Sequence, residues 1–330
     1  METRKLYYED PFQKGFATTV VSCDAVKGGY AVVLAETAFY PEGGGQPYDT
    51  GVLGEANVLE VHEKGGVITH LCDKPFEVGK SVSGKIDWAR RFDHMQQHSG
   101  EHICSGLICE RFHCDNVGFH MGADVVTIDF NADISWDELM EIEALANLYI
   151  YEDHPIDIQF YRGAELDKVE YRSKKPLEGD VRIVSFPGAD CCACCGTHVV
   201  RSGQVGLVKF LSVQKFRDGV RIELLSGKRA HRYLSECWAQ DVRIAQALSV
   251  KSNASFAGVE RVLAELSALK QRCAKLEESV FAQTAAQYEG KGDVLLFEDE
   301  MSGDSLRKLC DAVTNHCGGR CAVFAGADGA

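Results

Sequence analysis

The sequence predicts an α+β protein of several domains, and three observations lead to that prediction. Short runs rich in valine, threonine and aromatic residues fill residues 1–90. Strand-like and helical segments then alternate through the middle of the chain, and a long repeat of apolar residues begins beyond residue 240. At 330 residues the chain is also too long for a typical single domain. We therefore expect four parts, covering residues 1–90, 91–240, 241–290 and 291–330.

The first part, residues 1–90, is expected to be a small antiparallel β-barrel. Gly-Gly pairs and prolines separate its strand-like segments, which is typical of a closed sheet of short strands. These segments cover residues 16–26, 30–40, 51–62, 67–72 and 81–88. Before the third segment, three consecutive glycines (Gly43, Gly44 and Gly45) are followed by Gln46. Such glycines let a backbone approach a ligand closely, although glycines also close barrel turns.

The second part, residues 91–240, is expected to be an α+β domain. A helical segment over residues 92–112 carries three histidines, and a capping box of Ser135 and Glu138 opens another helix. Asp218-Gly219 is a hairpin signal between two strand-like runs. The expected strands cover residues 125–130, 181–186, 205–213 and 220–225.

The last two parts combine a long helix with the beginning of an α/β domain. Apolar residues at alternating spacings of three and four form a seam typical of a coiled coil. The seam consists of Val259, Val262, Leu266, Leu269, Cys273, Leu276 and Val280. It fits either a homodimer through residues 259–280 or an intramolecular helical hairpin, and we favour the homodimer. Residues 293–298, 305–314 and 321–325 then predict a partial βαβ unit, which looks like a domain cut short.

Composition limits the possible functions. No apolar run is long enough to span a membrane, and the N-terminus lacks the apolar stretch of a signal peptide, so we expect a cytoplasmic protein. Four of the 14 cysteines lie within residues 191–195, which in a cytosolic protein indicates metal binding or reactive thiols. The net charge of −14 argues against indiscriminate nucleic-acid binding. Residues 201–232 nevertheless hold eight lysines or arginines and two acids, a pattern that fits either a local patch contacting a nucleic-acid backbone or a solvated sheet face.

Two pairs of metal-type ligands, each spaced four positions apart, predict a divided zinc site. His98 and His102 lie on one face of the expected helix, with His94 a further turn back. Alone, this pair also fits an ordinary amphipathic helix. With Glu101 it forms the His-x-x-Glu-His string of inverted zinc peptidases, in which the glutamate is a general base.

The second pair, Cys194 and His198, lies in a cysteine-rich segment that we expect to be a tight loop. Thiolates and imidazoles are ligands that zinc prefers. A closed structural site made only of cysteines is the alternative at this point. Inverted zinc peptidases take their third ligand from a downstream helical glutamate, so the cysteine segment argues against a peptidase.

Four motifs in a fixed order resemble those of a known family. They are the residues 39–47, the His-x-x-x-His pair, Cys-Cys-Gly-Thr-His at 194–198, and Asp-Gly-Val-Arg-Ile-Glu at 218–223. Their order resembles the editing domain of alanyl-tRNA synthetase and, more closely, the free-standing AlaX alanyl-tRNA editing proteins. The resemblance covers roughly residues 10–235. Residues beyond it are similar to the C-terminal oligomerisation and tRNA-binding domain of the longer AlaX forms.

The resemblance implies a function and a set of site residues. It implies that the chain hydrolyses the ester linking a wrong serine or glycine to alanine tRNA, acting in trans because no ATP-binding aminoacylation core is present. One Zn²⁺ per chain would be bound by His98, His102, Cys194 and His198. The other implied residues are Gly43, Gly44, Gly45, Gln46 and Arg221 for substrate binding, and Gln46 and Glu101 for catalysis.

Two positions depart from the family pattern. Cys195 stands where a glycine is common, which leaves Cys191, Cys192 and Cys195 as alternative metal ligands. Glu101 stands where many synthetase relatives carry threonine, and it would alter the polarity of the pocket or supply a base. A tRNA-binding protein whose zinc is only structural remains the non-enzymatic alternative.

Overall fold

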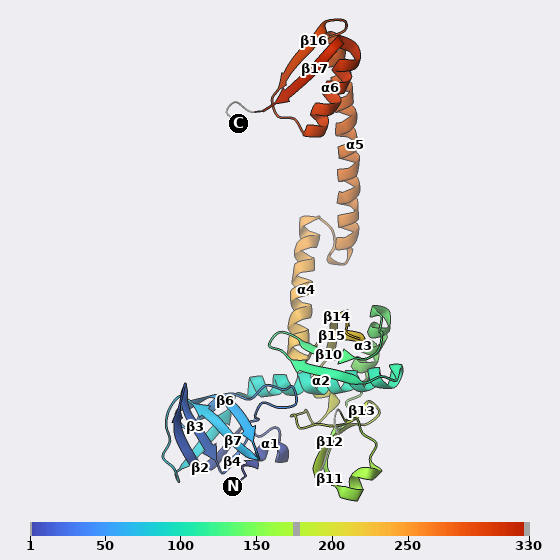
Figure 1. Ribbon diagram of the computed structural model, residues 1–330. Helices are drawn as coiled ribbons and strands as arrows, with labels where there is room; N and C mark the ends of the chain where they lie inside the picture. The colour runs from blue at the N-terminus through green and yellow to red at the C-terminus, as the bar shows by residue number, and fades with distance from the viewer. Residues whose placement is uncertain (1, 174–178, 327–330) are drawn as a thin grey trace. The chain divides into compact units, whose positions relative to one another are not determined.

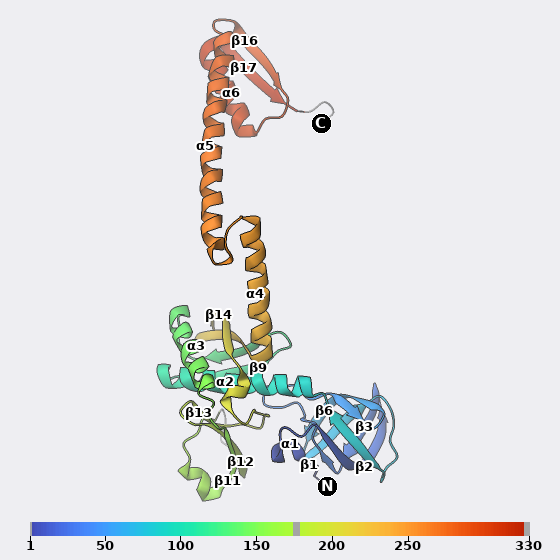
Figure 2. The ribbon, with the colours of Figure 1, turned by 180° about the vertical axis from the view of Figure 1, so that it is seen from behind.

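The computed structural model describes residues 2–173 and 179–326 of the chain, and the expected C-terminal part therefore extends over residues 327–330 that lie outside the description. The fold is a mixed α+β fold, as the sequence predicts. Two compact units divide the chain, Met1–Glu236 and Cys237–Ala330. Figures 1 and 2 show their elements from opposite sides. The division into four parts at residues 90, 240 and 290 stays a prediction.

The first unit begins with a closed ring of six antiparallel strands, in which each strand pairs with two neighbours. In order around the ring these are β2 (Gly15–Val26), β3 (Gly29–Leu34), β7 (Val67–Cys72), β6 (Ala56–Lys64), β5 (Gly51–Leu53) and β8 (Ser81–Ile86). Alternate residues of β2, including Phe16 and Val20, point into an apolar core, as expected for strands with one buried face.

Two short elements at the start of the chain and a third after β3 accompany this ring, and Leu6 and Tyr7 belong to its apolar core. Strand β1 (Arg4–Lys5) leads into helix α1 (Leu6–Glu9) and pairs in parallel with β4 (Glu36–Thr37). The expected strand over residues 30–40 is therefore two strands, β3 and β4. The expected strand over residues 51–62 is likewise the hairpin of β5 and β6, because Gly54 adopts the positive φ of 54° that a tight turn requires.

Helix α2 (Trp88–Phe112) leaves the ring and continues through the second half of the unit (Figures 1 and 2). It begins four residues earlier than expected because Asp87 caps it, its side chain accepting a hydrogen bond from the backbone N–H of Arg90. Arg91 is fully buried and pairs with the buried Asp49, which lies just before β5 of the ring. It also donates to the carbonyl oxygen of Ala38 at 2.6 Å, so the helix is tied to the ring by polar contacts.

The second half of the unit contains two antiparallel sheets. One is ordered β14 (Val208–Phe216), β15 (Gly219–Ser226), β10 (Val126–Phe130) and β9 (Asn116–Met121), and the other is ordered β11 (Asp157–Arg162), β12 (Asp180–Phe186) and β13 (Asp190–Ala193). Helix α3 (Trp136–Tyr151) starts at the expected capping box. Two short 3₁₀ helices, Gly163–Lys168 and Ser202–Val205, complete this half.

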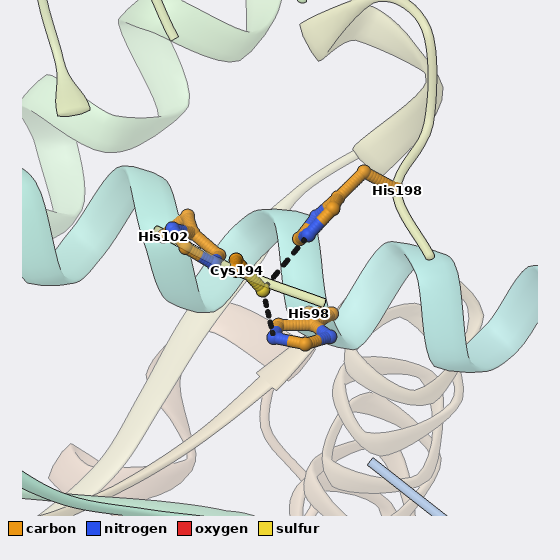
Figure 3. A group of neighbouring side chains, drawn as sticks. All are labelled: His98, His102, Cys194 and His198. Atoms are coloured by element: carbon orange, nitrogen blue, oxygen red, sulfur yellow. Dashed lines mark hydrogen bonds between the residues drawn. The ribbon is translucent and has the colours of Figure 1, made fainter. Parts of the chain in front are cut away.

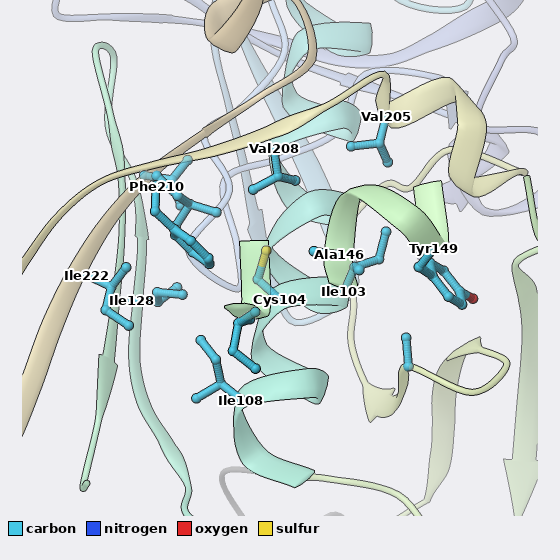
Figure 4. Close-up of a cluster of buried hydrophobic side chains, with 14 of the residues drawn as sticks. Ile103, Cys104, Ile108, Ile128, Ala146, Tyr149, Val205, Val208, Phe210 and Ile222 are labelled. Carbon is cyan, nitrogen blue, oxygen red and sulfur yellow. The ribbon is translucent and has the colours of Figure 1, made fainter. Parts of the chain in front are cut away.

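A core of apolar side chains joins these elements. Ile103, Cys104 and Ile108 of α2 pack with side chains from α3 and from the four-stranded sheet (Figure 4). The structure differs from expectation in two ways here. Strands β9 and β11 were not expected, and the first half of the cysteine segment is the strand β13, which pairs with β12, and not a loop.

The second unit consists of helices and one small sheet. Helix α4 (Gly227–Ala247) spans the boundary between the units, and a 3₁₀ turn (Ser252–Ala254) precedes helix α5 (Ser255–Gln287). Strand β16 (Gly292–Glu298), helix α6 (Gly303–Cys317) and strand β17 (Gly318–Ala325) form the expected βαβ arrangement, with parallel strands. Its apolar core includes Phe281 and Ala285 from the end of α5.

Candidate metal centre

Helix α2 and the segment after β13 bring four potential metal ligands together. His98 and His102 lie one helical turn apart and are buried, and Cys194 and His198 face them from the opposite segment (Figure 3). The ligand-type atoms of these four residues all lie within 4.8 Å of one another, and we call them the ligand cluster. The Sγ atom of Cys194 is 3.5 Å from Nε2 of His98 and 3.4 Å from Nε2 of His198.

Each histidine of the ligand cluster is held through its other ring nitrogen, Nδ1. Metal-binding histidines in proteins are commonly fixed by such a contact, which sets the orientation of the ring and leaves the second nitrogen for the metal. The contacts run from His98 to Oε1 of Gln46 at 2.9 Å, from His102 to Oδ2 of Asp190 at 2.8 Å, and from His198 to Oγ of Ser99 at 3.3 Å. The donor set and its supporting contacts thus fit a metal ion.

Asp190 is itself held in place. Arg172 donates from Nε to Oδ1 at 2.7 Å and from Nη2 to Oδ2 at 2.8 Å, a two-point contact that fixes the carboxylate. Burial raises the pKa of Asp190, but the contacts with His102 and Arg172 outweigh it and hold that pKa below its ordinary value. The carboxylate is therefore charged and available to His102.

The thiol of Cys194 lies among the three imidazoles. Burial raises its pKa, but the neighbouring His98, His198 and His102 outweigh burial and lower the pKa well below the ordinary value. The thiolate is the form of cysteine that binds metals. The surroundings of Cys194 therefore favour the ligating form.

Two glycines allow the two segments to approach each other. A Cβ atom on Gly106 of α2 would lie 2.0 Å from the carbonyl oxygen of Ala189, next to Asp190. A Cβ atom on Gly196 would lie 2.1 Å from Cε1 of His98. Real Cβ contacts are never this short, so only glycine fits at either position without moving the ligand cluster or its support.

Two cavities adjoin the glycine-rich loop. The first, of about 320 Å³, is lined by His98, His102 and Cys194 of the ligand cluster and by Glu101, and we call it the ligand cavity. The second, of about 550 Å³, is lined by all three consecutive glycines and by Gln46, and we call it the glycine-loop cavity. Gly44 lines both cavities.

The structure places Gln46 in a supporting position. Its side chain is buried, its Nε2 donates to Oγ1 of Thr197 at 2.9 Å, and its Oε1 accepts from the backbone N–H of Thr197 at 3.1 Å. With its contact to His98, Gln46 links both halves of the ligand cluster. Its predicted catalytic and substrate-binding roles remain predictions.

The other predicted site residues lie in different places. Glu101 is buried beside the ligand cavity, where its Oε1 accepts hydrogen bonds from Ser105 at 2.7 Å and from Asn116 at 2.8 Å. Arg221 lies on β15, donates to Asp129 and packs over the ring of Phe216, and it lines neither of the two cavities. Their predicted roles in catalysis and in substrate binding are untested.

A second group of potential ligands shares one member with the ligand cluster. His102, Asp190 and Cys192 also lie within 4.8 Å of one another. Asp190 already contacts Nδ1 of His102 and two guanidinium nitrogens, so its oxygens are engaged. Among the residues that the structure describes, no all-cysteine group and no group with a downstream glutamate meets the same criterion. The geometry therefore favours the ligand cluster.

Several supporting residues were not identified from the sequence. Asp190 directly precedes the cysteine segment, and Ser99 and Thr197 are neighbours of predicted ligands, so their positions gave a weak signal. Arg172 gave none, because it is distant in sequence from every motif. Phe119 stacks on the ring of His98, with centroids 5.0 Å apart, and it lies on β9, which was not expected.

Comparison with known proteins agrees with the motifs. Residues 12–90 match the family of class II (A) tRNA synthetases, and residues 181–223 match the second additional domain of threonyl and alanyl tRNA synthetases. An alanine–tRNA ligase of Pyrococcus abyssi is 35% identical over 94% of this chain, but the chain spans only 36% of that ligase.

Two further relatives are matched over most of both chains. The alanyl-tRNA editing protein Aarsd1-A of Xenopus laevis is 30% identical over 86% of this chain and 73% of its own length. The alanyl-tRNA editing protein AlaX-L of Pyrococcus horikoshii is 30% identical over 91% of this chain and 75% of its own length. The chain thus belongs to the alanyl-tRNA editing protein family.

Proposed function

We propose that this protein is a zinc-dependent hydrolase that removes a wrongly attached serine or glycine from alanine tRNA. One observation supports this proposal above the others. Four residues from segments almost a hundred positions apart converge on one centre, and that centre lines a cavity of about 320 Å³. The names of the two editing relatives agree with such an activity.

The donor set suits a single Zn²⁺ ion. Zinc prefers tetrahedral sites of imidazole and thiolate ligands, and three histidines with one cysteine provide them. A bound zinc ion supplies Lewis acidity to an ester carbonyl or lowers the pKa of a water molecule. The contribution of the chain is to hold the ligands rigidly, through Gln46, Asp190 and Ser99.

Selectivity is proposed to come from polar groups at the ligand cavity. Serine differs from alanine by one hydroxyl, and a site built to hydrogen-bond that hydroxyl disfavours the analogue that lacks it by roughly 10⁴-fold or more. Glu101 and Asn116 line this cavity and are buried, so they are our candidates for contacting the hydroxyl. In this role Glu101 would be an acceptor and not a general base.

The proposal can be tested by deacylation assays on alanine tRNA that carries serine, glycine or, correctly, alanine. We expect rapid hydrolysis of at least one wrongly charged form, slow hydrolysis of Ala-tRNA, and loss of activity with a chelator that returns when zinc is added. Equal, metal-independent rates on all three substrates would contradict the proposal.

We further propose that a second copy of this chain binds along residues 259–280 of α5. All seven seam residues are exposed, with Leu269 and Leu276 more than half exposed, although a seam of this kind normally packs against another helix. Among the described residues, α5 reaches the core of the second unit only through its C-terminal end. This exposure does not support the intramolecular hairpin.

The proposed substrate indicates the cellular compartment in which the protein acts. Aminoacylated tRNA is used by ribosomes, so we propose that the protein works in the cytoplasm. In the described residues, no helix is both long and apolar enough to cross a membrane.

A further inference from the structure

A third cavity of the first unit is lined mainly by basic side chains. It has a volume of about 430 Å³, and four lysines or arginines face one acid, Asp93. We call it the arginine cavity. The basic residues are Arg90, Lys228, Arg229 and Arg232. Such an excess of positive charge is unexpected in a chain whose net charge is −14, and it marks a site suited to an anion.

Contacts within the arginine cavity divide these residues into fixed and free ones. Arg229 pairs with Asp93 and donates from Nη1 to the carbonyl oxygen of Gly122 at 2.8 Å. Arg90 donates from Nε to the carbonyl oxygen of Tyr48 at 3.0 Å. These two arginines therefore form a fixed wall of the cavity.

Lys228 and Arg232 form the exposed side of the cavity, one turn apart on α4. The only ion pair that the described residues give Arg232 is a long one, 3.9 Å, to the exposed Glu236. Exposed pairs of this kind are weak and give way readily to a better partner. Both side chains are therefore available to a ligand.

Buried His94 is a further side chain at the arginine cavity. It lines the cavity, and its Nδ1 has no hydrogen-bond partner among the described residues. Burial, followed by the charges of Arg90, Arg229 and Arg91, lowers the pKa of His94 to about 3. The positive charges of these arginines thus add to the effect of burial in lowering the pKa of His94.

Shared lining residues connect the arginine cavity, through the glycine-loop cavity, with the ligand cavity. Pro47 lines both the arginine cavity and the glycine-loop cavity, and Gly44 lines both the glycine-loop cavity and the ligand cavity. Strand β9 and the loop after it pass the three cavities in the same order. Phe119 lines the ligand cavity, His120 lines the glycine-loop cavity, and Gly122 lines the arginine cavity.

Helix α2 sets the distance between the two ends of this path. Twelve residues separate Arg90, at the arginine cavity, from His102, at the ligand cavity. At about 1.5 Å per residue they are roughly 18 Å apart along the helix. This distance corresponds to roughly five stacked nucleotides at about 3.4 Å each, or to fewer in an extended strand.

We propose that the arginine cavity binds backbone phosphates of the RNA strand whose aminoacylated 3′ end occupies the ligand cavity. This inference rests on the proposed function. Lys228 and Arg232 contact the phosphates, while Arg90 and Arg229 maintain the positive field. Phosphate contacts of this kind fix the register of the strand without reading its sequence.

The test compares two double variants with the same change of charge. Lys228→Glu/Arg232→Glu alters the arginine cavity. Lys85→Glu/Lys215→Glu alters exposed lysines of the same unit that do not line it. Each variant and the wild type are assayed on Ser-tRNA and on seryl-adenosine, an ester that carries no phosphate. Direct binding of an RNA hairpin with an unpaired 3′ CCA end is measured by fluorescence anisotropy across a salt series, with inorganic phosphate as competitor.

We expect the cavity variant to lose roughly 10- to 100-fold in kcat/KM on Ser-tRNA and a similar factor in its affinity for the hairpin. The slope of log affinity against log salt concentration should become smaller in magnitude by about 1 to 2. Its activity on seryl-adenosine should be unchanged, and the control variant should resemble the wild type. Equal losses in both variants, or a loss on seryl-adenosine, would overturn the inference. The inference would also be overturned if inorganic phosphate displaced the labelled hairpin as effectively as unlabelled hairpin does.

The hairpin measurement also separates this inference from the proposed function. If the wild type hydrolyses neither ester, the proposed function fails, but a hairpin affinity that depends on Lys228 and Arg232 would still support the arginine cavity as an RNA site.

Discussion

The two long helices of this protein distribute polar and apolar residues in opposite ways. Helix α2 buries charged and polar side chains, among them Arg91, His98 and Glu101. Helix α5 exposes apolar ones, and Leu269 and Leu276 are 56% and 57% exposed. Both arrangements are unfavourable for a helix considered alone, because buried polar groups need partners and exposed apolar groups lose the benefit of burial.

The two helices obtain compensation for these unfavourable arrangements in different ways. The polar side chains of α2 have partners within the first unit, such as Asp49 and Asp190, and the ligand cluster is suited to a metal ion. The apolar seam of α5 has no such partner among the described residues, and a second copy of the chain is our proposed one. Changes in α2 should therefore affect the site and the fold, and changes in the α5 seam should affect assembly.

The largest effect is expected from loss of a metal ligand. His98→Ala should lower the deacylation rate by about 10³-fold, since a metal ion stabilises transition-state charge by several kcal/mol. It should also reduce the zinc content of the purified protein. His316→Ala, an exposed histidine of α6, is the control and should change neither. Full activity of His98→Ala would contradict the proposed role of His98 as a metal ligand.

Loss of the buried ion pair of α2 should be the next largest effect. Arg91→Ala leaves Asp49 buried without its partner, and we expect about 3–5 kcal/mol less free energy of unfolding, measured by urea denaturation. The matched control is Arg111→Ala on the same helix, whose pair with Glu141 is exposed and should contribute no more than about 1 kcal/mol. Similar losses in both variants would show that burial does not distinguish these pairs.

A smaller effect is expected from filling the space beside His98. Gly196→Ala would place a Cβ atom against the imidazole ring, and the ring must move. Disturbing the support of a ligand typically weakens metal affinity by about 10- to 100-fold. Competition with a chromophoric chelator measures this affinity. Gly15→Ala is the control, because its nearest neighbour would be 3.6 Å away, and an equal effect there would argue against the steric explanation.

The smallest effect on the site is expected from changes to α5. Leu266→Lys/Leu269→Lys should convert a dimer into a monomer, as determined by sedimentation equilibrium, while hydrolysis of seryl-adenosine stays at the wild-type rate. Leu263→Lys lies beside the seam and is 59% exposed, so it should leave the dimer intact. A wild-type protein that is monomeric at all accessible concentrations would contradict the proposed partner of α5.

Much of this arrangement could be predicted from local sequence patterns. The capping box at Ser135, the Asp218-Gly219 hairpin and the βαβ unit are all present, because each depends on neighbouring residues. The ligand cluster was also predicted, because the two residues of each pair are only four positions apart. His98 and His102 lie on one helix, and Cys194 and His198 lie in one short segment.

The supporting structure was harder to predict because it depends on contacts distant in sequence. The partnership of Arg172 with Asp190, and that of Gln46 with Thr197, are set by how β13 and the glycine-rich loop pack against α2. The part of helix α4 before residue 241 was not expected either. The arginine cavity escaped notice for the same reason, since Arg90 and Arg229 come from different helices and only the fold brings them together. The basic stretch at residues 201–232 contains three of the cavity's four basic residues, Lys228, Arg229 and Arg232, but not Arg90.

Cys194 and the three histidines of the ligand cluster are proposed to bind one metal ion. Cobalt(II) can replace zinc, and a cobalt–thiolate bond produces a near-ultraviolet charge-transfer band. The account predicts one cobalt ion per chain with this band in the wild type, loss of the band in Cys194→Ser, and its retention in Cys195→Ser. A chain that binds no ion, or a band that disappears with Cys195 and survives without Cys194, would contradict the claim.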